Sequence, residues 1–304
     1  MKSSERRRKR KGKRLAFKSK LTYGLVAGIF VISCFLLFFF LNGQYQTDVD
    51  GTQKAAIVDQ LSDSYPNQTF VETSQTVLRN SGFKVYYYSK VAVDVNFYRN
   101  LPNLDFDVII LRVHSAVKEQ SNLLVFFTSE PFNDFKARTT YLSDFLNDPP
   151  RLVRAMIYEG SDPYFGITPS FVQSMKGKFD DTVIIMMGCN GLDPAHTSMA
   201  EALINKGAKA CIGWDELVSS FHTDHAITCL LQKLLVEKKT IQIAVGEINS
   251  EVGPDPAYRS KLSWHPAAAG YYSFQSNLCN TFSCLIFFKK LEKLTKICSY
   301  HRNV

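Results

Sequence analysis

Two apolar runs, each followed by a chemically reactive side chain, constrain the fold of this 304-residue chain more than any other feature. One run covers residues 106–113 and precedes His114, and the other covers residues 183–187 and precedes Gly188 and Cys189. Parallel strands that are buried on both faces lose the alternation of polar and apolar residues and have this form. Because the carboxyl ends of neighbouring parallel strands meet at one edge of a sheet, we expect His114 and Cys189 to lie close together.

The other segments extend this pattern into an alternation of strands and helices. Strands are predicted at residues 54–61, 83–89, 106–114, 182–188 and 208–214. Helices are predicted at residues 68–79, 95–101, 168–175, 197–206, 220–238 and 241–251. A strand at 123–128 is expected at the edge of a hairpin-like insertion, and a last short strand is expected at 270–275. This order predicts an α/β domain with three layers, α/β/α, around a mostly parallel sheet.

Positive charge is concentrated at the N-terminus. Residues 1–20 hold eleven Lys and Arg against Glu5, a net charge of +10, which leaves −2 of the total of +8 for the rest of the chain. The uncharged segment that follows is long enough to cross a bilayer as a helix. We predict five parts, which are a basic tail (1–20), a transmembrane helix (21–42), a stalk (43–53), a folded domain (54–278) and an apolar, then basic, C-terminal tail (279–304).

The position of the basic tail predicts the orientation of the chain. Positive residues beside a membrane span stay in the cytoplasm, which places the N-terminus there and the folded domain on the extracytoplasmic side of the cell membrane. A cleaved signal peptide is the alternative. Its apolar core has about 7–15 residues and is followed by a small-x-small cleavage site, whereas the apolar segment here is longer and no such site follows it. Contact with anionic lipid accounts for the tail, so we expect a membrane partner and no nucleic acid.

The two strand ends offer the parts of a nucleophilic site. A cysteine attacks as its thiolate and needs a base or a lowered pKa to form it, and His114 is placed to be that base for Cys189. Gly188 and Gly191 permit a tight turn, and backbone N–H groups of such a turn stabilise a developing oxyanion. The alternative is a buried structural thiol beside a hydrogen-bonded histidine.

The second strand end resembles a known family. The segments that carry the resemblance are MGCNG (187–191), MAEAL (199–203) and GAKACIGWD (207–215). They are similar to the caspase–haemoglobinase fold of the clan CD cysteine peptidases, which includes caspases, gingipains, legumain, separase and the CHAT domains. The resemblance covers about residues 106–235. It implies a cysteine endopeptidase with a His/Cys dyad after two neighbouring strands.

The resemblance also implies roles for further residues. The family usually has Gly after the histidine, whereas this chain has Ser115, whose backbone N–H would hold the oxyanion together with that of Cys189. Separase-like and CHAT members carry acidic residues past the Trp, one of which can pair a basic substrate side chain. Asp215 and Asp224 are the candidates here, and Asp224 resembles the substrate-pocket acid more closely, which implies cleavage after Arg or Lys. For Asp224 the alternative is a helix N-cap.

No metal or cofactor is expected from the sequence. The histidines and the carboxylate at residues 222–225 lack further ligands in a recognisable pattern. The expected partner is therefore a protein or peptide substrate. Two other functions stay open, which are a catalytically inactive pseudopeptidase that binds proteins at the membrane, favoured by Ser115, and a transpeptidase of the same fold.

Overall fold

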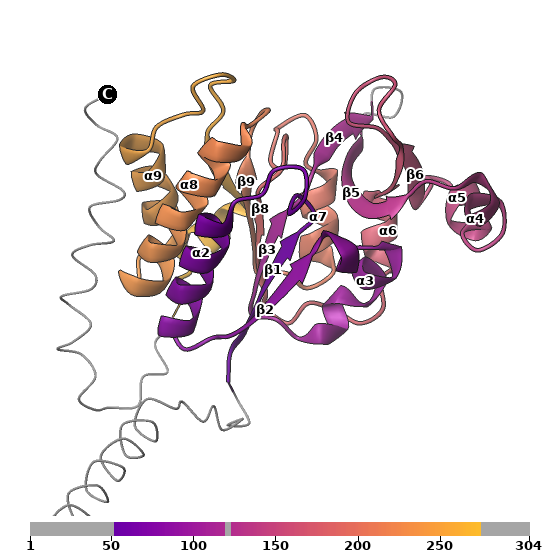
Figure 1. Cartoon of the computed structure of the whole chain (residues 1–304). Helices are drawn as coiled ribbons and strands as arrows, with labels where there is room; N and C mark the ends of the chain where they lie inside the picture. The colour runs from indigo at the N-terminus through magenta and orange to yellow at the C-terminus, as the bar shows by residue number, and fades with distance from the viewer. Residues whose placement is uncertain (1–51, 119–122, 275–304) are drawn as a thin grey trace, which may run out of the picture. The chain divides into compact units, whose positions relative to one another are not determined.

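A six-stranded sheet in the order β10-β9-β8-β3-β1-β2 forms the centre of the computed structural model, which describes residues 52–118 and 123–274 (Figure 1). The strands are β1 (Lys54–Asp59), β2 (Lys84–Ser89), β3 (Val108–Arg112), β8 (Val183–Met186), β9 (Ala210–Trp214) and β10 (Leu262–His265). All neighbouring strands are parallel except β10, which is antiparallel to β9. The prediction of an α/β fold with a mostly parallel sheet is confirmed.

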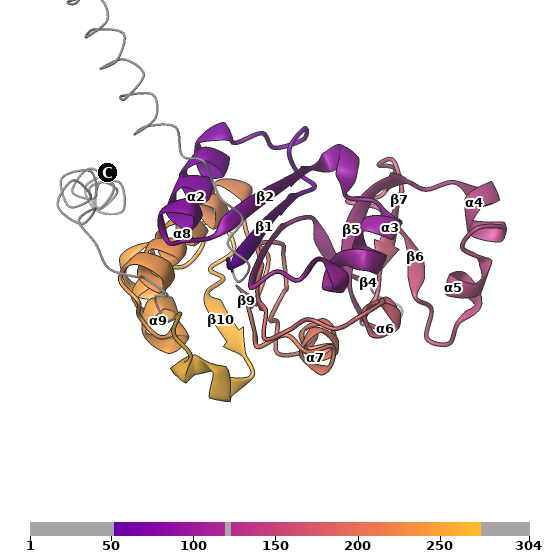
Figure 2. The same ribbon diagram turned by 90° about the horizontal axis from the view of Figure 1, so that it is seen from below.

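Helices cover both faces of this sheet. One face carries α2 (Gln68–Asn80), α8 (Ser220–Leu231) and α9 (Ile241–Glu251), and the other carries α3 (Val95–Asn100), α6 (Pro169–Ser174) and α7 (Ser198–Asn205) (Figure 2). Successive strand residues alternate between the two cores, so that Ile110 and Ile185 belong to one and Ile109 and Ile184 to the other. Burial on both faces explains why the strands are apolar without alternation.

A second sheet of four antiparallel strands, in the order β4-β5-β7-β6, lies in the chain between β3 and β8. Its strands are β4 (Ser115–Lys118), β5 (Leu123–Pro131), β6 (Leu152–Ala155) and β7 (Tyr164–Ile167). β5 pairs with both β4 and β7, so the prediction that it is an edge strand was wrong. The short helices α4 (Asp134–Arg138) and α5 (Leu142–Leu146) follow β5 and project from this sheet in Figure 1.

The bounds of α6 and α9 agree with the predicted ranges to within one residue, and the last strand differs from its prediction. The Thr168 side chain accepts a hydrogen bond from the Phe171 N–H and caps α6, and α9 has the predicted bounds. α8 ends earlier than predicted and continues as a π-helical turn, η3 (Gln232–Val236). Up to residue 274, the predicted strand at 270–275 is replaced by the 3-10 helix η4 (Ala267–Tyr271), and the edge strand is β10. The alternating aromatic residues there mimic a strand although they do not pair as one.

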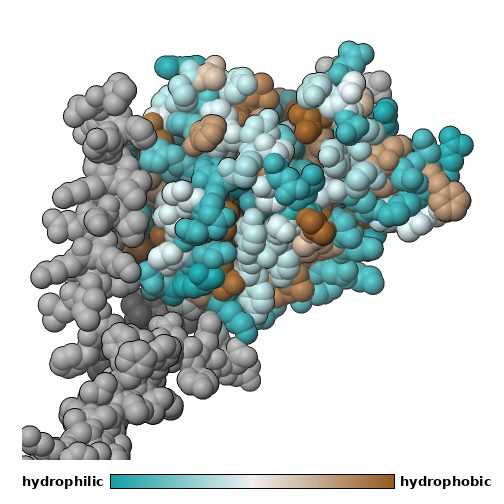
Figure 3. All heavy atoms as spheres, viewed as in Figure 1, coloured by the Kyte–Doolittle hydropathy of each residue, from teal (hydrophilic) through white to brown (hydrophobic). Residues whose placement is uncertain are grey.

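Three of the predicted parts lie outside the described residues. These are the basic tail, the transmembrane helix and the C-terminal tail, together with nearly all of the stalk. Among residues 52–118 and 123–274, no helix combines the length and the apolar character that crossing a membrane requires. On the face shown in Figure 3, hydrophobic residues are scattered among hydrophilic ones. Scattered exposure of this kind is normal for a folded domain.

Candidate active site

The sheet brings together the segments that follow β3 and β8. We call residues 113–115 the histidine turn and residues 188–191 the cysteine turn. β3 and β8 are parallel neighbours, with Leu111 opposite Met186, and the Met187 N–H donates to the Leu111 carbonyl at 2.9 Å. Paired residues therefore differ by 75 in number (186 − 111), and His114 and Cys189, which follow the two strands, are separated by the same number. The prediction that the two apolar runs are neighbouring parallel strands is confirmed.

The two turns pack against each other closely. Ser115 Oγ donates a hydrogen bond to the Cys189 carbonyl oxygen at 2.6 Å. Gly188 has no room for a side chain, because a Cβ there would lie 2.6 Å from the Val113 carbonyl oxygen and closer still to Ser115 Oγ. Glycine at position 188 is thus required by the approach of the histidine turn.

The thiol of Cys189 is half-buried and neutral. Its Sγ donates to the Val218 carbonyl oxygen at 3.8 Å, and no hydrogen bond joins it to the His114 ring among the described residues. Burial raises the pKa of the Cys189 thiol, and the negative charge of Asp255 raises it further. The thiolate must therefore be generated by proton transfer to a base, rather than being present beforehand.

The imidazole of His114 is also neutral. Its ring lies edge-on to the rings of Tyr65 and Phe127, with centroid distances of 5.8 and 5.9 Å. Burial lowers the pKa of His114, and the positive charge of Arg112 lowers it further. Its Nε2 is buried and has no hydrogen-bond partner within the part of the chain that the structure describes. A neutral imidazole with an unused nitrogen can accept a proton from the thiol once the side chains turn toward each other.

Two backbone N–H groups remain for an oxyanion. Ser115 is opposite Phe126 on β5, and the Phe127 N–H donates to the His114 carbonyl at 2.9 Å. That bond makes the Ser115–Phe126 pair the non-hydrogen-bonded kind, so the Ser115 N–H points away from β5, toward the open edge of β4. Among the described residues, no backbone carbonyl of another residue accepts a hydrogen bond from the Cys189 N–H. Both predicted donors are therefore unused by the secondary structure.

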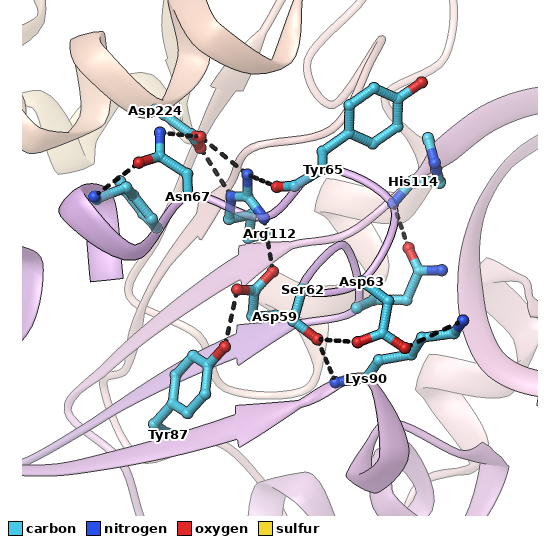
Figure 4. A network of polar contacts seen from close by, with 12 residues as sticks. Asp59, Ser62, Asp63, Tyr65, Asn67, Tyr87, Lys90, Arg112, His114 and Asp224 are labelled. Carbon is cyan, nitrogen blue, oxygen red and sulfur yellow. Dashed lines mark hydrogen bonds and ion pairs between the residues drawn. The ribbon is translucent and has the colours of Figure 1, made fainter. Parts of the chain in front are cut away.

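Asp224 is occupied by a cation of the same chain. Arg112 donates to its two carboxylate oxygens from Nε and Nη2, each at 2.8 Å, and Asn67 Nδ2 donates to Oδ2 at 2.9 Å (Figure 4). Asp224 and Arg112 are both buried. The helix-cap alternative is wrong, because the N-cap of α8 is Ser219. In this arrangement Asp224 is not the free carboxylate that a basic substrate side chain would require.

Asp215 keeps part of its carboxylate open. It lies directly before Glu216, whose carbonyl accepts the Asn190 N–H at 2.9 Å, so it borders the segment that holds the cysteine turn. Its Oδ1 accepts the Lys261 N–H at 2.7 Å, while no hydrogen bond or ion pair from the described residues reaches Oδ2. Of the two predicted acids, Asp215 is the one available to a ligand.

Sequence reasoning missed the structural role of Arg112. Its Nη1 also donates to Asp59 Oδ1 at 2.8 Å, and its Nη2 donates to the Tyr65 carbonyl at 2.7 Å, so it joins β1, β3, α8 and the segment before α2 (Figure 4). The available signal was a charged residue at the end of each of two apolar strands, Asp59 as the last residue of β1 and Arg112 as the last residue of β3. Charged side chains in buried strands have to be paired.

A surface pocket of about 480 Å³ lies near the ends of β2 and β5, and it contains neither member of the dyad. Four of its charged side chains form two ion pairs, Lys90 with Asp63 at 3.5 Å and Lys136 with Glu130 at 2.8 Å, and the fifth, Asp94, caps α3. Within the described ranges, no group of three or more His, Cys, Asp or Glu side chains is arranged to hold a metal ion. Among the described residues, the candidate nucleophile and the candidate base therefore lie past the ends of β3 and β8 and not in this pocket.

Comparison with known proteins adds no family. No protein-family model matches the chain, and no curated protein matches it. Among solved structures, the chain is similar to a protein from Geobacter sulfurreducens, with a TM-score of 0.36 and 11% identity over 75% of this chain and 100% of the other. A likeness at this level supports no argument about fold or function.

The two neutral side chains predict the pH dependence of any hydrolysis at this site. His114 accepts a proton only when neutral, and its pKa lies below the ordinary value of about 6.5. We expect kcat/KM to rise with pH through a midpoint below about 6.5 and to stay level to about pH 8.5, the ordinary cysteine pKa, because the thiol pKa is raised. A pH–rate profile from pH 5 to 10 measures this, and an acid limb centred above pH 7 would contradict it.

Proposed function

We propose that this protein is a membrane-anchored cysteine peptidase of caspase-like fold, with Cys189 as nucleophile and His114 as base. The observation that carries the proposal is that β3 and β8 are adjacent parallel strands and that Ser115, directly after His114, donates to the Cys189 carbonyl oxygen at 2.6 Å. This is the arrangement that the clan CD resemblance implies. The unused N–H groups of Ser115 and Cys189 support it, because an acyl-transfer site needs donors for the oxyanion.

The chemistry follows from these groups. His114 takes the thiol proton, and Cys189 Sγ attacks the carbonyl carbon of a peptide bond, whose oxygen becomes an oxyanion held by the N–H groups of Cys189 and Ser115. The C–N bond then breaks, and the imidazolium gives its proton to the leaving amine. A water molecule, deprotonated by His114, hydrolyses the thioester to release the acid and restore the thiol. These steps need no cofactor.

Two further parts of the proposal rest on the sequence. The anchor is the apolar segment at residues 21–42, which places the N-terminus in the cytoplasm and the catalytic domain outside it. For the side chain that precedes the cleaved bond, the proposal keeps a basic residue and assigns its recognition to Asp215, because the carboxylate of Asp224 is paired with Arg112.

A membrane-anchored binding module without activity is the second candidate. It is favoured by one observation, which is that the Cys189 thiol donates to the Val218 carbonyl and not to the imidazole. A module of this kind would bind a peptide at the same edge of the sheet without forming a thioester. The two candidates therefore differ in the reactivity of Cys189 and agree in the place where a peptide binds.

Labelling with an electrophilic peptide separates the two candidates. The full chain in detergent is treated with peptidyl chloromethyl ketones that carry Arg, Lys, Asp or Asn next to the reactive group, and the modified cysteine is identified by mass spectrometry. We expect Cys189 to be labelled, the rate to fall at least tenfold in His114→Ala, and the preference for Arg and Lys to be lost in Asp215→Asn. The fully buried Cys211 is the internal control and should stay unmodified.

The same experiment has a clear contrary result. If Cys189 reacts no faster with the peptide reagent than with iodoacetamide, and His114→Ala leaves both rates unchanged, the thiol is not activated by the histidine. The peptidase proposal would then fail, and the binding module would be the better account.

A further inference from the structure

The hydroxyl of Ser115 joins the two halves of the candidate site. Ser115 is buried, with 7% of its surface exposed, and its Oγ donates to the Cys189 carbonyl oxygen at 2.6 Å. Among the described residues it makes the one side-chain hydrogen bond between the histidine turn and the cysteine turn. A side chain that departs from the glycine of the resembling family therefore has a specific partner, the main chain of the nucleophile.

The peptide unit between Cys189 and Asn190 is held at both ends. Its carbonyl oxygen accepts from Ser115 Oγ, and its N–H donates to the Glu216 carbonyl at 2.9 Å. The first bond comes from the first residue of β4, shortly after β3, and the second comes from the segment after β9, so the peptide is held by segments that follow the strands on either side of β8. The next residue, Asn190, has a left-handed backbone with φ of 58°. Asparagine is among the non-glycine residues that adopt this conformation most readily, so the chain can turn sharply here after the held peptide.

Fixing this peptide plane fixes the nucleophile. Because β8 fixes the chain before Cys189, this plane restricts the ψ angle of Cys189 and with it the direction of the Cα–Cβ bond. We propose that Ser115 is a positioning residue, whose hydroxyl holds the Cys189–Asn190 peptide so that the Cα–Cβ bond of Cys189 keeps Sγ directed at the substrate carbonyl. This inference rests on the proposed function. It goes beyond it in assigning a role to a side chain that otherwise counts against activity.

The geometry of Gly188 agrees with this role. A Cβ at position 188 would collide with Ser115 Oγ, so the hydroxyl occupies the space that the missing side chain leaves. The Ser115 N–H points to the open edge of β4 and takes no part in the bond made by its hydroxyl. Removing the hydroxyl therefore leaves the predicted oxyanion donor in place and tests the positioning role alone.

The chain offers a matched control at the opposite end of the same two strands. Thr182 Oγ1, directly before β8, donates to the carbonyl oxygen of Phe106, shortly before β3, also at 2.6 Å. Ser115→Ala and Thr182→Val each remove one buried hydroxyl that donates to a backbone carbonyl between the two strand segments. The melting temperature should fall by a similar amount in both variants, because each loses one hydrogen bond from a hydroxyl to a backbone carbonyl.

The kinetic outcomes should differ. We expect Ser115→Ala to lower kcat about 10- to 100-fold with KM nearly unchanged, because a displaced nucleophile costs rate rather than binding. Thr182→Val should keep the wild-type kcat, and Ser115→Thr, which keeps a hydroxyl, should recover most of it. The alkylation rate of Cys189 by iodoacetamide, measured on the full chain without turnover, should fall in Ser115→Ala and not in Thr182→Val.

The failures are distinguishable. If Ser115→Ala keeps the wild-type kcat and alkylation rate while Cys189→Ala is inactive, the positioning role is wrong and the peptidase proposal stands. If Cys189→Ala is as active as the wild type, the peptidase proposal is wrong whatever Ser115 does. If Ser115→Ala and Thr182→Val lower kcat equally, the effect of Ser115 is on stability alone and the inference is overturned.

Discussion

Cys189→Ala is expected to lower kcat/KM for peptide hydrolysis about 10⁴- to 10⁶-fold, the loss that follows removal of a catalytic nucleophile. Alanine lacks the sulfur that forms the thioester, while the N–H groups of the turn remain. His114→Ala should cost nearly as much, because the raised pKa of the Cys189 thiol leaves little thiolate without a base. The double variant should be no slower than either single one, since the two residues act as a unit.

The measurement uses the full chain in detergent with fluorogenic peptides that end in Arg, Lys, Asp or Asn. Cys211→Ala is the matched control, because it removes a thiol that is fully buried on β9. We expect it to keep the wild-type kcat/KM. Turnover that survives in Cys189→Ala would show that another group attacks. Equal peptide binding by the wild type and both variants, with no turnover in any of them, would favour the binding module.

The parts of the fold that were predictable are those whose burial is visible in the local pattern. β3 and β8 are covered on both faces, so every residue is apolar until the strand ends, and α9 spans Ile241–Glu251 as expected. The second sheet was largely missed because its strands are short and take their shape from their partners. β7, for example, has four residues and includes Gly166, which no strand pattern favours.

The same distinction applies to the candidate site. The positions of His114 and Cys189 follow from strand ends, which the sequence marks. The partner of Asp224 is Arg112, 112 residues away in the chain, and no local pattern reports such a contact. The bond from Ser115 to Cys189 spans 74 residues and depends on the close approach at Gly188. Sequence reasoning thus indicated where the two candidate side chains lie and could not predict the contacts that surround them.

Arg112 and the two carboxylates that it binds form a cluster of buried charged side chains beside the site. Its guanidinium is 1% exposed and binds two carboxylates, Asp59 and Asp224, which are themselves buried. Burial raises the pKa of Asp59, and Arg112 opposes that shift, while the Tyr87 hydroxyl donates to the same carboxylate at 3.0 Å. One cation thus compensates two carboxylates in a region from which water is excluded.

Arg112→Met is expected to lower the free energy of unfolding by about 3–5 kcal/mol, because it leaves two buried carboxylates without their cation. Chemical denaturation of the full chain at pH 7.5 measures the loss. Lys54→Met is the control, since Lys54 pairs with Asp105 at 3.1 Å on the surface, where an ion pair contributes at most about 1 kcal/mol. Arg112→Lys should fall between them, because an ammonium cannot reproduce the forked contact with Asp224.

The pH dependence identifies charge as the cause. In Arg112→Met the folded-state pKa of Asp59, which burial already raises, moves further above the unfolded value of about 3.9, because Asp59 loses its cation and keeps the negative charge of Asp224 as a neighbour. A raised folded-state pKa makes the variant relatively more stable at low pH, and that stability is lost as pH rises through the raised pKa. The difference from the wild type should therefore be largest at pH 7.5 and shrink toward pH 4.

A partial rescue tests the same argument from the other side. Asn at position 224 carries no charge, so Arg112→Met with Asp224→Asn should recover part of the lost stability although it has one native contact fewer. The contrary result is a loss of unfolding free energy in Arg112→Met that does not depend on pH and that Asp224→Asn does not relieve. It would mean that packing of the guanidinium accounts for the effect, for example its contact with the Phe70 ring, whose centroid lies 5.6 Å away. Because Arg112 also holds the Tyr65 carbonyl and the Tyr65 ring contacts His114, the charge-based result would tie the stability of this cluster to the placement of the base.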